Sequence, residues 1–253
     1  MRARSILAAA AAAVVLAGTV GCGRSHNGPL SITVFAAASL KETFTDIAQR
    51  FEADNPGTSV NLEFAGSSDL VAQLKRGAVA DVFAAGDTNT MNDATRAGLL
   101  AEVPIDFASN TLAIVVAKHN PQGIGSFTDL NRPGLAVAVC APVVPCGAAA
   151  ERIEDSTGVR LHPVSQESSV TDVLAKVISG QADAGLVYIT DALGAGDAVA
   201  MVPFTQSVGA VNTYSIAVLR DSKHPGLANR FIALVTGDPG RNILTRAGFT
   251  KPT

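Results

Sequence analysis

The chain has 253 residues, of which 47% are hydrophobic and 16% are charged, and its formal net charge is −3. That length is enough for one large α/β unit or for two lobes. The slightly acidic balance excludes the basic surface that nucleic acid binding requires, so we expect no nucleic acid partner. Aromatic residues make up only 5% of the chain. Alanine, valine and glycine dominate, as expected of helices packed tightly on a buried parallel sheet.

The N-terminal segment has the pattern of a secretory signal. Two arginines precede the apolar run 6–17, which is shorter than the roughly 20 residues needed to cross a membrane. The end of the segment, "AGTVGC", resembles a bacterial lipoprotein signal, in which the cysteine carries the lipid. We therefore predict a lipoprotein signal peptide at 1–21, lipidation of Cys22 and a tether at 22–30. The alternative is ordinary cleavage nearby, which leaves this cysteine as a free thiol.

Strand and helix patterns alternate along the rest of the chain. We predict strands at 32–36, 60–64, 82–84, 111–117, 135–139, 184–188 and 213–219. We predict helices at 40–54, 68–76, 90–97, 147–157, 170–179, 226–236 and 240–247. This alternation is typical of an α/β fold with mostly parallel sheets flanked by helices.

Two similar segments indicate that the chain passes between two lobes. "ASNTLAIVV" and "GAVNTYSIAVL" each lead from small residues into an extended run, about 100 residues apart. We predict a discontinuous lobe 1 at 31–108 and 212–253, and a continuous lobe 2 at 109–211. Ligands of open α/β sheets bind at the carboxyl ends of the strands. The expected ligand site is therefore a cleft between the lobes.

Four strand-to-helix junctions are rich in small residues and hydroxyl groups: "FAAASLKE", "FAGSSDLVAQL", "PVVPCGAAAER" and "SQESSVTDVL". The start of a helix leaves backbone N–H groups unpaired at the positive end of the peptide dipole, and small residues let an anion approach them. Capping is the alternative interpretation of each serine. Ser39 with Glu42, and Ser169 with Asp172, have the spacing of a capping box.

Cys140 and Cys146 form an even pair once Cys22 is set aside. In an oxidising compartment such a pair predicts a disulfide. The alternative is two separate thiols whose side chains diverge. A zinc site is not expected, because no histidine or second cysteine pair stands nearby.

Four motifs together carry a family resemblance: "TVFAAASL", "FAGSSDLVAQLKRGAVADVFAAGD", "VPCGAAAERI" and "VISGQADAGLVYITDAL". In this order they resemble the periplasmic molybdate-binding proteins of ABC transporters, over residues 31–249. The resemblance implies a type II periplasmic-binding-protein fold that closes around one tetrahedral oxyanion, molybdate or tungstate. It also implies a ligand set of three hydroxyl groups and two backbone N–H groups, from Ser39, Ser67 and Tyr188 and from Cys146 and Val170 respectively.

The sequence departs from the family pattern at the two cysteines. Cys146 stands where the family usually has alanine, and Cys140 where it often has glycine. If the two pair, the loop is pinned and the N–H of Cys146 is preorganised. The aromatic ring of Tyr188 also suits a simple core role at a strand end.

All members of the implied ligand set are neutral hydrogen-bond donors. A fully deprotonated dianion accepts from each of them, whereas the proton of hydrogen phosphate would face donors and cost about 1–3 kcal/mol. Sulfate, which also lacks a proton, is the main alternative ligand. Molybdenum would be bound only as its oxyanion, without a direct protein ligand and without a cofactor. We expect the carboxylate of Asp69 to point away from the anion.

The resemblance implies an ABC permease and its ATPase as partners, and we expect a monomer. An extracellular serine hydrolase is the second alternative, and it would need a histidine base beside a serine. His119, His162 and His224 all lie in proline-containing loops, and no G-x-S-x-G motif is present. An amino-acid-binding protein is also less favoured, because the junctions offer no obvious arginine for a carboxylate. We therefore predict a binding protein rather than an enzyme.

Overall fold

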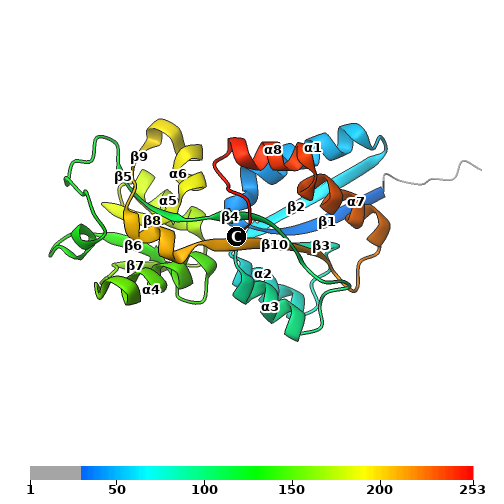
Figure 1. Ribbon diagram of the computed structural model, residues 1–253, viewed down its shortest axis with the longest axis horizontal. Helices are drawn as coiled ribbons and strands as arrows, with labels where there is room; N and C mark the ends of the chain where they lie inside the picture. The colour runs from blue at the N-terminus through cyan, green and yellow to red at the C-terminus, as the bar shows by residue number, and fades with distance from the viewer. Residues whose placement is uncertain (1–29, 253) are drawn as a thin grey trace, which may run out of the picture.

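The computed structural model of the protein describes residues 30–252. The predicted signal peptide, the lipidation site at Cys22 and nearly all of the predicted tether lie outside these residues. Within the described part, the strands form two five-stranded sheets that lie end to end along the long axis of the molecule (Figure 1). No helix of this part is long and apolar enough to cross a membrane.

The first sheet has the strand order β2-β1-β3-β10-β4. Its strands are β1 (Leu30–Ala37), β2 (Thr58–Ala65), β3 (Val82–Ala85), β4 (Ile105–Asn110) and β10 (Asn212–Val218). β1 is parallel to β2 and β3, whereas β10 is antiparallel to β3 and β4. We call the part of the chain around this sheet lobe 1.

The second sheet repeats this arrangement with the order β7-β6-β8-β5-β9. Its strands are β5 (Leu112–Ala117), β6 (Val137–Cys140), β7 (Ser165–Glu167), β8 (Ala184–Tyr188) and β9 (Val199–Val202). β6 is parallel to β7 and β8, and β5 is antiparallel to β8 and β9. The predicted α/β class is confirmed: four of the five strands in each sheet run in the same direction, and the sheets are mixed only because β10 and β5 run against their neighbours. We call this part lobe 2.

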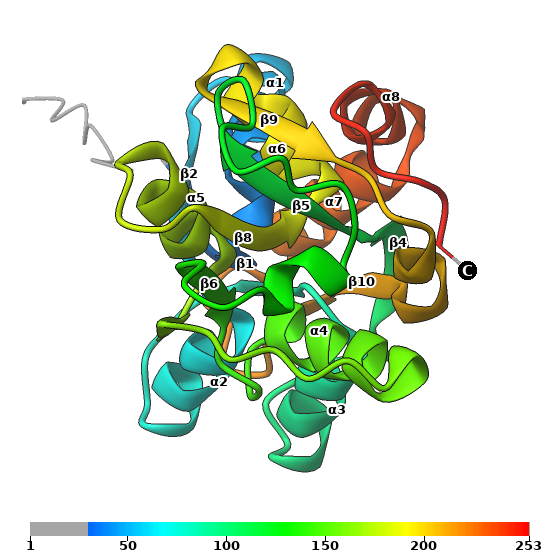
Figure 2. The same ribbon diagram turned by 90° about the vertical axis from the view of Figure 1, so that its left-hand side faces the viewer.

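Helices flank both sheets. The helices of lobe 1 are α1 (Lys41–Asp54), α2 (Ser67–Lys75), α3 (Thr88–Arg96), α7 (Pro225–Thr236) and α8 (Asp238–Arg246). The helices of lobe 2 are α4 (Pro145–Thr157), α5 (Val170–Ile178) and α6 (Ile189–Ala195). In lobe 1, α1, α7 and α8 cover one face and α2 and α3 the other. Figure 2 looks onto the outer end of lobe 2 and shows α4 and α6 on opposite sides of its sheet.

The start of lobe 1 shows why the sequence folds this way. β1 carries apolar side chains on both faces, which suits a central strand covered on both sides. In α1 the buried residues Phe44, Ile47 and Phe51 recur every three or four positions, as expected for a helix with one apolar face. Both phenylalanines pack edge-on against Phe231 of α7, at centroid distances of 6.0 and 5.5 Å. These contacts hold α1 against α7.

The chain changes sheets twice, at two adjacent points. β4 ends at Asn110 and β5 begins at Leu112, and the chain returns from the 3₁₀ turn η4 (Thr205–Ala210) into β10. Asn110 and Asn212 are paired in the antiparallel register of β4 and β10. The two crossing strands therefore lie side by side where the lobes meet. The first crossing falls two residues after the predicted boundary at 108, and β10 begins at the predicted return.

Several short elements were not predicted. β4, β7, β9 and α6 are absent from the expected elements, and a 3₁₀ turn, η1 (Ala38–Leu40), precedes α1. β7 has only three residues, and α6 follows β8 without an intervening turn. Neither has the length or the flanking turn residues by which a sequence marks an element.

Candidate functional site

The five residues of the predicted ligand set line one small cavity between the lobes. Its lining consists of Ala37, Ala38, Ser39, Gly66, Ser67, Gly86, Val144, Pro145, Cys146, Val170 and Tyr188. None of these residues carries a charge. The cavity volume is about 10 Å³, close to the space that a single water needs. A cavity of this size has no room for an amino acid or a sugar.

Ser39 reaches the cavity from the turn between β1 and α1. Its hydroxyl lies 2.9 Å from the hydroxyl of Tyr214 on β10. The 3₁₀ turn carries Ser39 away from the start of α1, whose N-cap is Leu40 and has no side-chain cap. The capping interpretation of Ser39 is therefore wrong. The neighbouring Ala37 and Ala38 are buried and keep this end of the strand narrow, which leaves space in front of the hydroxyl.

Ser67 reaches the cavity from the first turn of α2. Its side chain is 1% exposed, and its oxygen accepts a hydrogen bond of 3.0 Å from the backbone N–H of Gly86. Gly66 occupies the N-cap position and no side chain caps this helix, so the hydroxyl of Ser67 does not act as a cap. Because its oxygen already accepts one hydrogen bond, the hydroxyl hydrogen remains to be donated. Asp69 is exposed and does not line the cavity, as predicted.

Lobe 2 turns the starts of two helices toward the cavity. α4 begins at Pro145, which has no N–H, so Cys146 offers the first backbone donor. α5 begins at Val170, and its N-cap Ser169 accepts from the N–H of Asp172 at 3.2 Å. The capping interpretation is confirmed for Ser169. The first N–H groups of both helices have no partner within the helix, and the helix dipole makes their surroundings favourable for an anion.

A disulfide joins Cys140 at the end of β6 to Cys146 at the start of α4. The loop between them is tight, because a side chain at Gly147 would overlap the carbonyl oxygen of Ala141. The bond therefore ties the end of a core strand to the helix start that faces the cavity. This places the backbone N–H of Cys146 in a constrained position.

Tyr188 ends β8 with its ring in the core and its hydroxyl at the cavity. The residue is 2% exposed, and its oxygen accepts a hydrogen bond of 2.6 Å from Nδ2 of Asn212. Its ring meets that of Tyr214 edge to face at 5.9 Å. Burial raises the pKa of Tyr188 well above its usual value, so the hydroxyl stays protonated and can donate. The ring of Tyr188 thus packs in the core while its hydroxyl lines the cavity.

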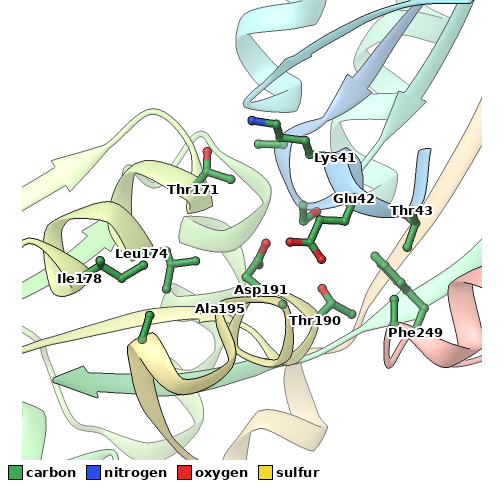
Figure 3. Close-up of a pocket in the computed structure, with 15 residues that line it drawn as sticks. Lys41, Glu42, Thr43, Thr171, Leu174, Ile178, Thr190, Asp191, Ala195 and Phe249 are labelled. Atoms are coloured by element: carbon green, nitrogen blue, oxygen red, sulfur yellow. The ribbon is translucent and has the colours of Figure 1, made fainter. Parts of the chain in front are cut away.

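A second, larger groove lies between the lobes beside the cavity. It has a volume of about 200 Å³ and is lined by Glu42 from α1 and Asp191 from α6, among others. Figure 3 shows the two carboxylates pointing toward each other. Oδ2 of Asp191 accepts from the backbone N–H of Tyr188 at 3.1 Å. Burial, with the charge of Glu42 as a smaller cause, raises the pKa of Asp191 to about 7.

Sequence analysis missed Asn212, Tyr214 and Asp191. Asp191 stands three residues after Tyr188 and accepts from its backbone N–H, as the acidic residue of a capping box does. That spacing is the one signal that could have indicated any of the three.

The histidines of the described residues lie away from the cavity. His119 and His162 are exposed, His224 is half-buried, and none of the three is part of the cavity lining. Within residues 30–252, neither Ser39 nor Ser67 is hydrogen-bonded to a histidine. Among the described residues, these two serines are therefore paired with Tyr214 and Gly86 rather than with a histidine base of the kind a serine nucleophile uses.

Two lobes with matching sheets, two crossing strands and a small donor-lined cavity between them define a type II periplasmic binding protein. The fold is similar to that of the periplasmic molybdate-binding protein of Azotobacter vinelandii, with a TM-score of 0.77 over 88% of this chain and 100% of that one, at 19% identity. It is also similar to the sulfate-binding protein SubI of Mycobacterium tuberculosis H37Rv, with a TM-score of 0.75 over 88% and 87% of the two chains, at 20% identity.

Sequence comparison gives the family. Residues 32–250 match the family described as bacterial extracellular solute-binding protein, and the chain belongs to that family. It is 54% identical to the molybdate-binding protein ModA of Mycobacterium tuberculosis (strain ATCC 25618 / H37Rv) over 249 residues, which cover 95% of each chain. It is 28% identical to the molybdate-binding protein ModA of Escherichia coli (strain K12), over 87% of this chain and 88% of that one.

Proposed function

We propose that this protein captures molybdate, and also tungstate, outside the cytoplasmic membrane and delivers it to an ABC importer. The observation that carries the proposal is the cavity wall, where Ser39, Ser67 and Tyr188 offer hydroxyl groups and Cys146 and Val170 offer backbone N–H groups. The 54% identity to a molybdate-binding protein over nearly the whole chain supports the same ligand.

The chemistry of these donors explains how a site without cations can bind a dianion. Preorganised dipoles in a site that excludes water stabilise charge without reorganising. All five groups donate, so an oxyanion that carries no proton can accept from every one of them. Hydrogen phosphate would place its proton against donors and leave a buried polar group unpaired, at a cost of about 1–3 kcal/mol.

The remaining parts of the proposal concern location and partners. We propose that Cys22 is lipidated and anchors the protein, as a monomer, to the outer face of the cell membrane. The partners would be a transmembrane permease and its cytoplasmic ATPase, and they would recognise the form in which the two lobes are closed around the anion. Membership of an extracellular solute-binding family supports the location outside the cytoplasmic membrane.

Calorimetric titration of the purified protein with molybdate, tungstate, sulfate and phosphate tests the ligand. We expect saturable binding of molybdate and tungstate, weaker binding of sulfate and none of phosphate. Sulfate also lacks a proton, so only the size of the closed site can separate it from molybdate. Tighter binding of sulfate than of molybdate would replace the proposed ligand, and absence of heat with every anion would overturn oxyanion binding.

A further inference from the structure

A chain of hydrogen bonds leads from α4 to the hydroxyl of Tyr188. The guanidinium of Arg152 donates to Oδ1 of Asn212 at 2.5 Å, and Nδ2 of Asn212 donates to the hydroxyl oxygen of Tyr188 at 2.6 Å. Asn212 is only 2% exposed, so water does not compete for these contacts. These hydrogen bonds therefore run from Arg152 in lobe 2 to Asn212, the first residue of β10, and back to Tyr188 in lobe 2.

The neighbours of Asn212 determine which way its amide points. Arg152 can only donate, so the atom that faces it must be the amide oxygen. The NH₂ group then has two acceptors, the carbonyl oxygen of Pro145 at 3.1 Å and the hydroxyl of Tyr188. A reversed amide would set two donors together at the guanidinium and two acceptors together at Pro145. Asn212 is therefore held as a donor to Tyr188.

This donor leaves the Tyr188 hydroxyl with one direction for its own hydrogen. One lone pair of its oxygen accepts from Asn212, so the hydrogen must point away from Asn212. On that side lie the cavity and the hydroxyl of Tyr214, which is itself paired with Ser39. An anion in the cavity is a stronger acceptor than the neutral Tyr214 hydroxyl.

We propose that Arg152 and Asn212 are positioning residues that hold the Tyr188 hydroxyl as a donor toward the bound oxyanion. The cation never enters the cavity, yet its charge polarises the amide and through it the hydroxyl. The arrangement enforces the donor-only character of the site, and with it the rejection of protonated oxyanions. This inference rests on the proposed function.

The other crossing strand carries a similar arrangement. Asn110 is the partner of Asn212 in the strand register. Its oxygen accepts from the N–H of Thr111 at 3.0 Å, which leaves its NH₂ group to donate to Thr190 at 2.8 Å and to the hydroxyl of Tyr214. Two paired asparagines at the crossing thus each support one tyrosine hydroxyl, one beside each half of the cavity.

A double-mutant cycle with Asn212→Asp and Tyr188→Phe tests the proposal, with molybdate titrated by calorimetry. An aspartate can only accept, so it would draw the hydroxyl hydrogen away from the cavity. We expect Asn212→Asp to weaken molybdate binding about 100-fold in the presence of Tyr188, and about 10-fold or less in the Tyr188→Phe background, where only the added charge acts. The ratio of molybdate to phosphate affinity should also fall, because the hydroxyl oxygen can then accept the phosphate proton.

Arg152→Met is the second variant, since it keeps the apolar stem and leaves the buried asparagine in place. We expect about a 10-fold loss of molybdate affinity that disappears in the Tyr188→Phe background. Arg160→Met is the matched control, because it removes the same charge from a side chain that is 60% exposed and forms only surface ion pairs. Equal losses in both backgrounds would show a purely structural role and overturn the proposal. Failure of the unaltered protein to bind molybdate would instead overturn the proposed function.

Discussion

The two halves of the cavity wall are built from different kinds of donor. Lobe 1 contributes the side-chain hydroxyls of Ser39 and Ser67, which rotate about single bonds and are steered by Tyr214 and Gly86. Lobe 2 contributes the starts of α4 and α5, whose N–H directions are set by the helix backbone, together with the hydroxyl of Tyr188.

The two kinds of donor give the two lobes different roles in binding. Backbone donors at a helix start need no reorganisation, and the disulfide at Cys146 constrains one of them further. Lobe 2 is thus the half that is ready to receive an anion, and lobe 1 completes the shell when the lobes meet. The following substitutions test this difference between the lobes.

Gly66→Ala should have the largest effect on molybdate affinity, because the added methyl group would keep the two lobes apart. Gly66 of lobe 1 lies directly against lobe 2, and a Cβ there would overlap the carbonyl oxygen of Ser168. Its φ of −57° suits any residue, so lobe 1 itself should fold normally. We expect molybdate affinity to fall at least about 100-fold, or roughly 2.7 kcal/mol, in calorimetric titrations.

Gly209→Ala is the matched control for this change. A Cβ at Gly209 would have no atom within 4 Å. It should leave affinity and melting temperature unchanged. Binding by Gly66→Ala as tight as in the unaltered protein would show that the lobes need not approach this closely around the anion.

Removal of the disulfide should have the second-largest effect, and it should lower the free energy of unfolding more than the affinity for molybdate. Replacing Cys140 and Cys146 with alanine frees a short loop, which the chain-entropy treatment values at about 2 kcal/mol in the free energy of unfolding. The donor from residue 146 is a backbone N–H and survives the change, so we expect only about a 3-fold loss of affinity. Denaturant titration and calorimetry measure the two effects. A larger loss of affinity than of stability would mean that the bond mainly shapes the cavity.

Ser39→Ala should have a smaller effect, confined to binding. The hydroxyl does not cap α1, so we expect about a 10-fold loss of molybdate affinity with little change in melting temperature. Ser169→Ala provides the contrast, because Ser169 does cap its helix and its loss should cost about 1 kcal/mol of stability. Calorimetry measures the molybdate affinity of both variants, and thermal melts measure their stability. Equal loss of stability at the two positions would show that Ser39 stabilises the fold as much as the capping residue Ser169 does.

Ser39 and Ser169 also show which features of the site could be predicted from the sequence alone. Ser39 and Ser169 have the same three-residue spacing to an acidic residue, yet only Ser169 caps its helix. The 3₁₀ turn before α1 makes the difference, and spacing cannot reveal it. Four of the residues that line the cavity, Ser39, Ser67, Cys146 and Val170, stand at strand-to-helix junctions rich in small residues, which are local features of the chain. Tyr188 has no such local mark and was implied only by the family resemblance.

The supporting residues were not predictable, because their partners are distant in the sequence. Tyr214 meets Ser39 across 175 positions, and Asn212 meets Tyr188 across 24. Nothing in the surrounding residues marks these contacts, since they arise only when β10 crosses between the sheets. The same holds for Asp191 and Glu42, which face each other from different lobes. Local patterns therefore reveal the donors of a site more readily than the groups that orient them.

Asp191→Asn should have the smallest effect, and it concerns the groove where the lobes face each other. The folded protein raises the pKa of Asp191 from 3.8 to about 7, so between these values the folded state binds more protons than the unfolded state. Stability therefore falls as pH rises toward 7 and levels off above it. Between pH 6 and pH 8 the loss should be roughly 1 kcal/mol, or about 3 °C in melting temperature. An asparagine keeps an oxygen for the N–H of Tyr188 and should remove this part of the pH dependence.

Glu42→Gln distinguishes burial from repulsion between the lobes as the cause. Burial is the larger cause of the raised pKa, and the charge of Glu42 is a smaller one. Neutralising Glu42 should therefore shift the pH dependence of the melting temperature to slightly lower pH without abolishing it. Complete loss of the dependence in this variant would show that the two carboxylates, rather than the burial of one, set the response, and that lobe 1 acts on lobe 2 through charge as well as through the cavity.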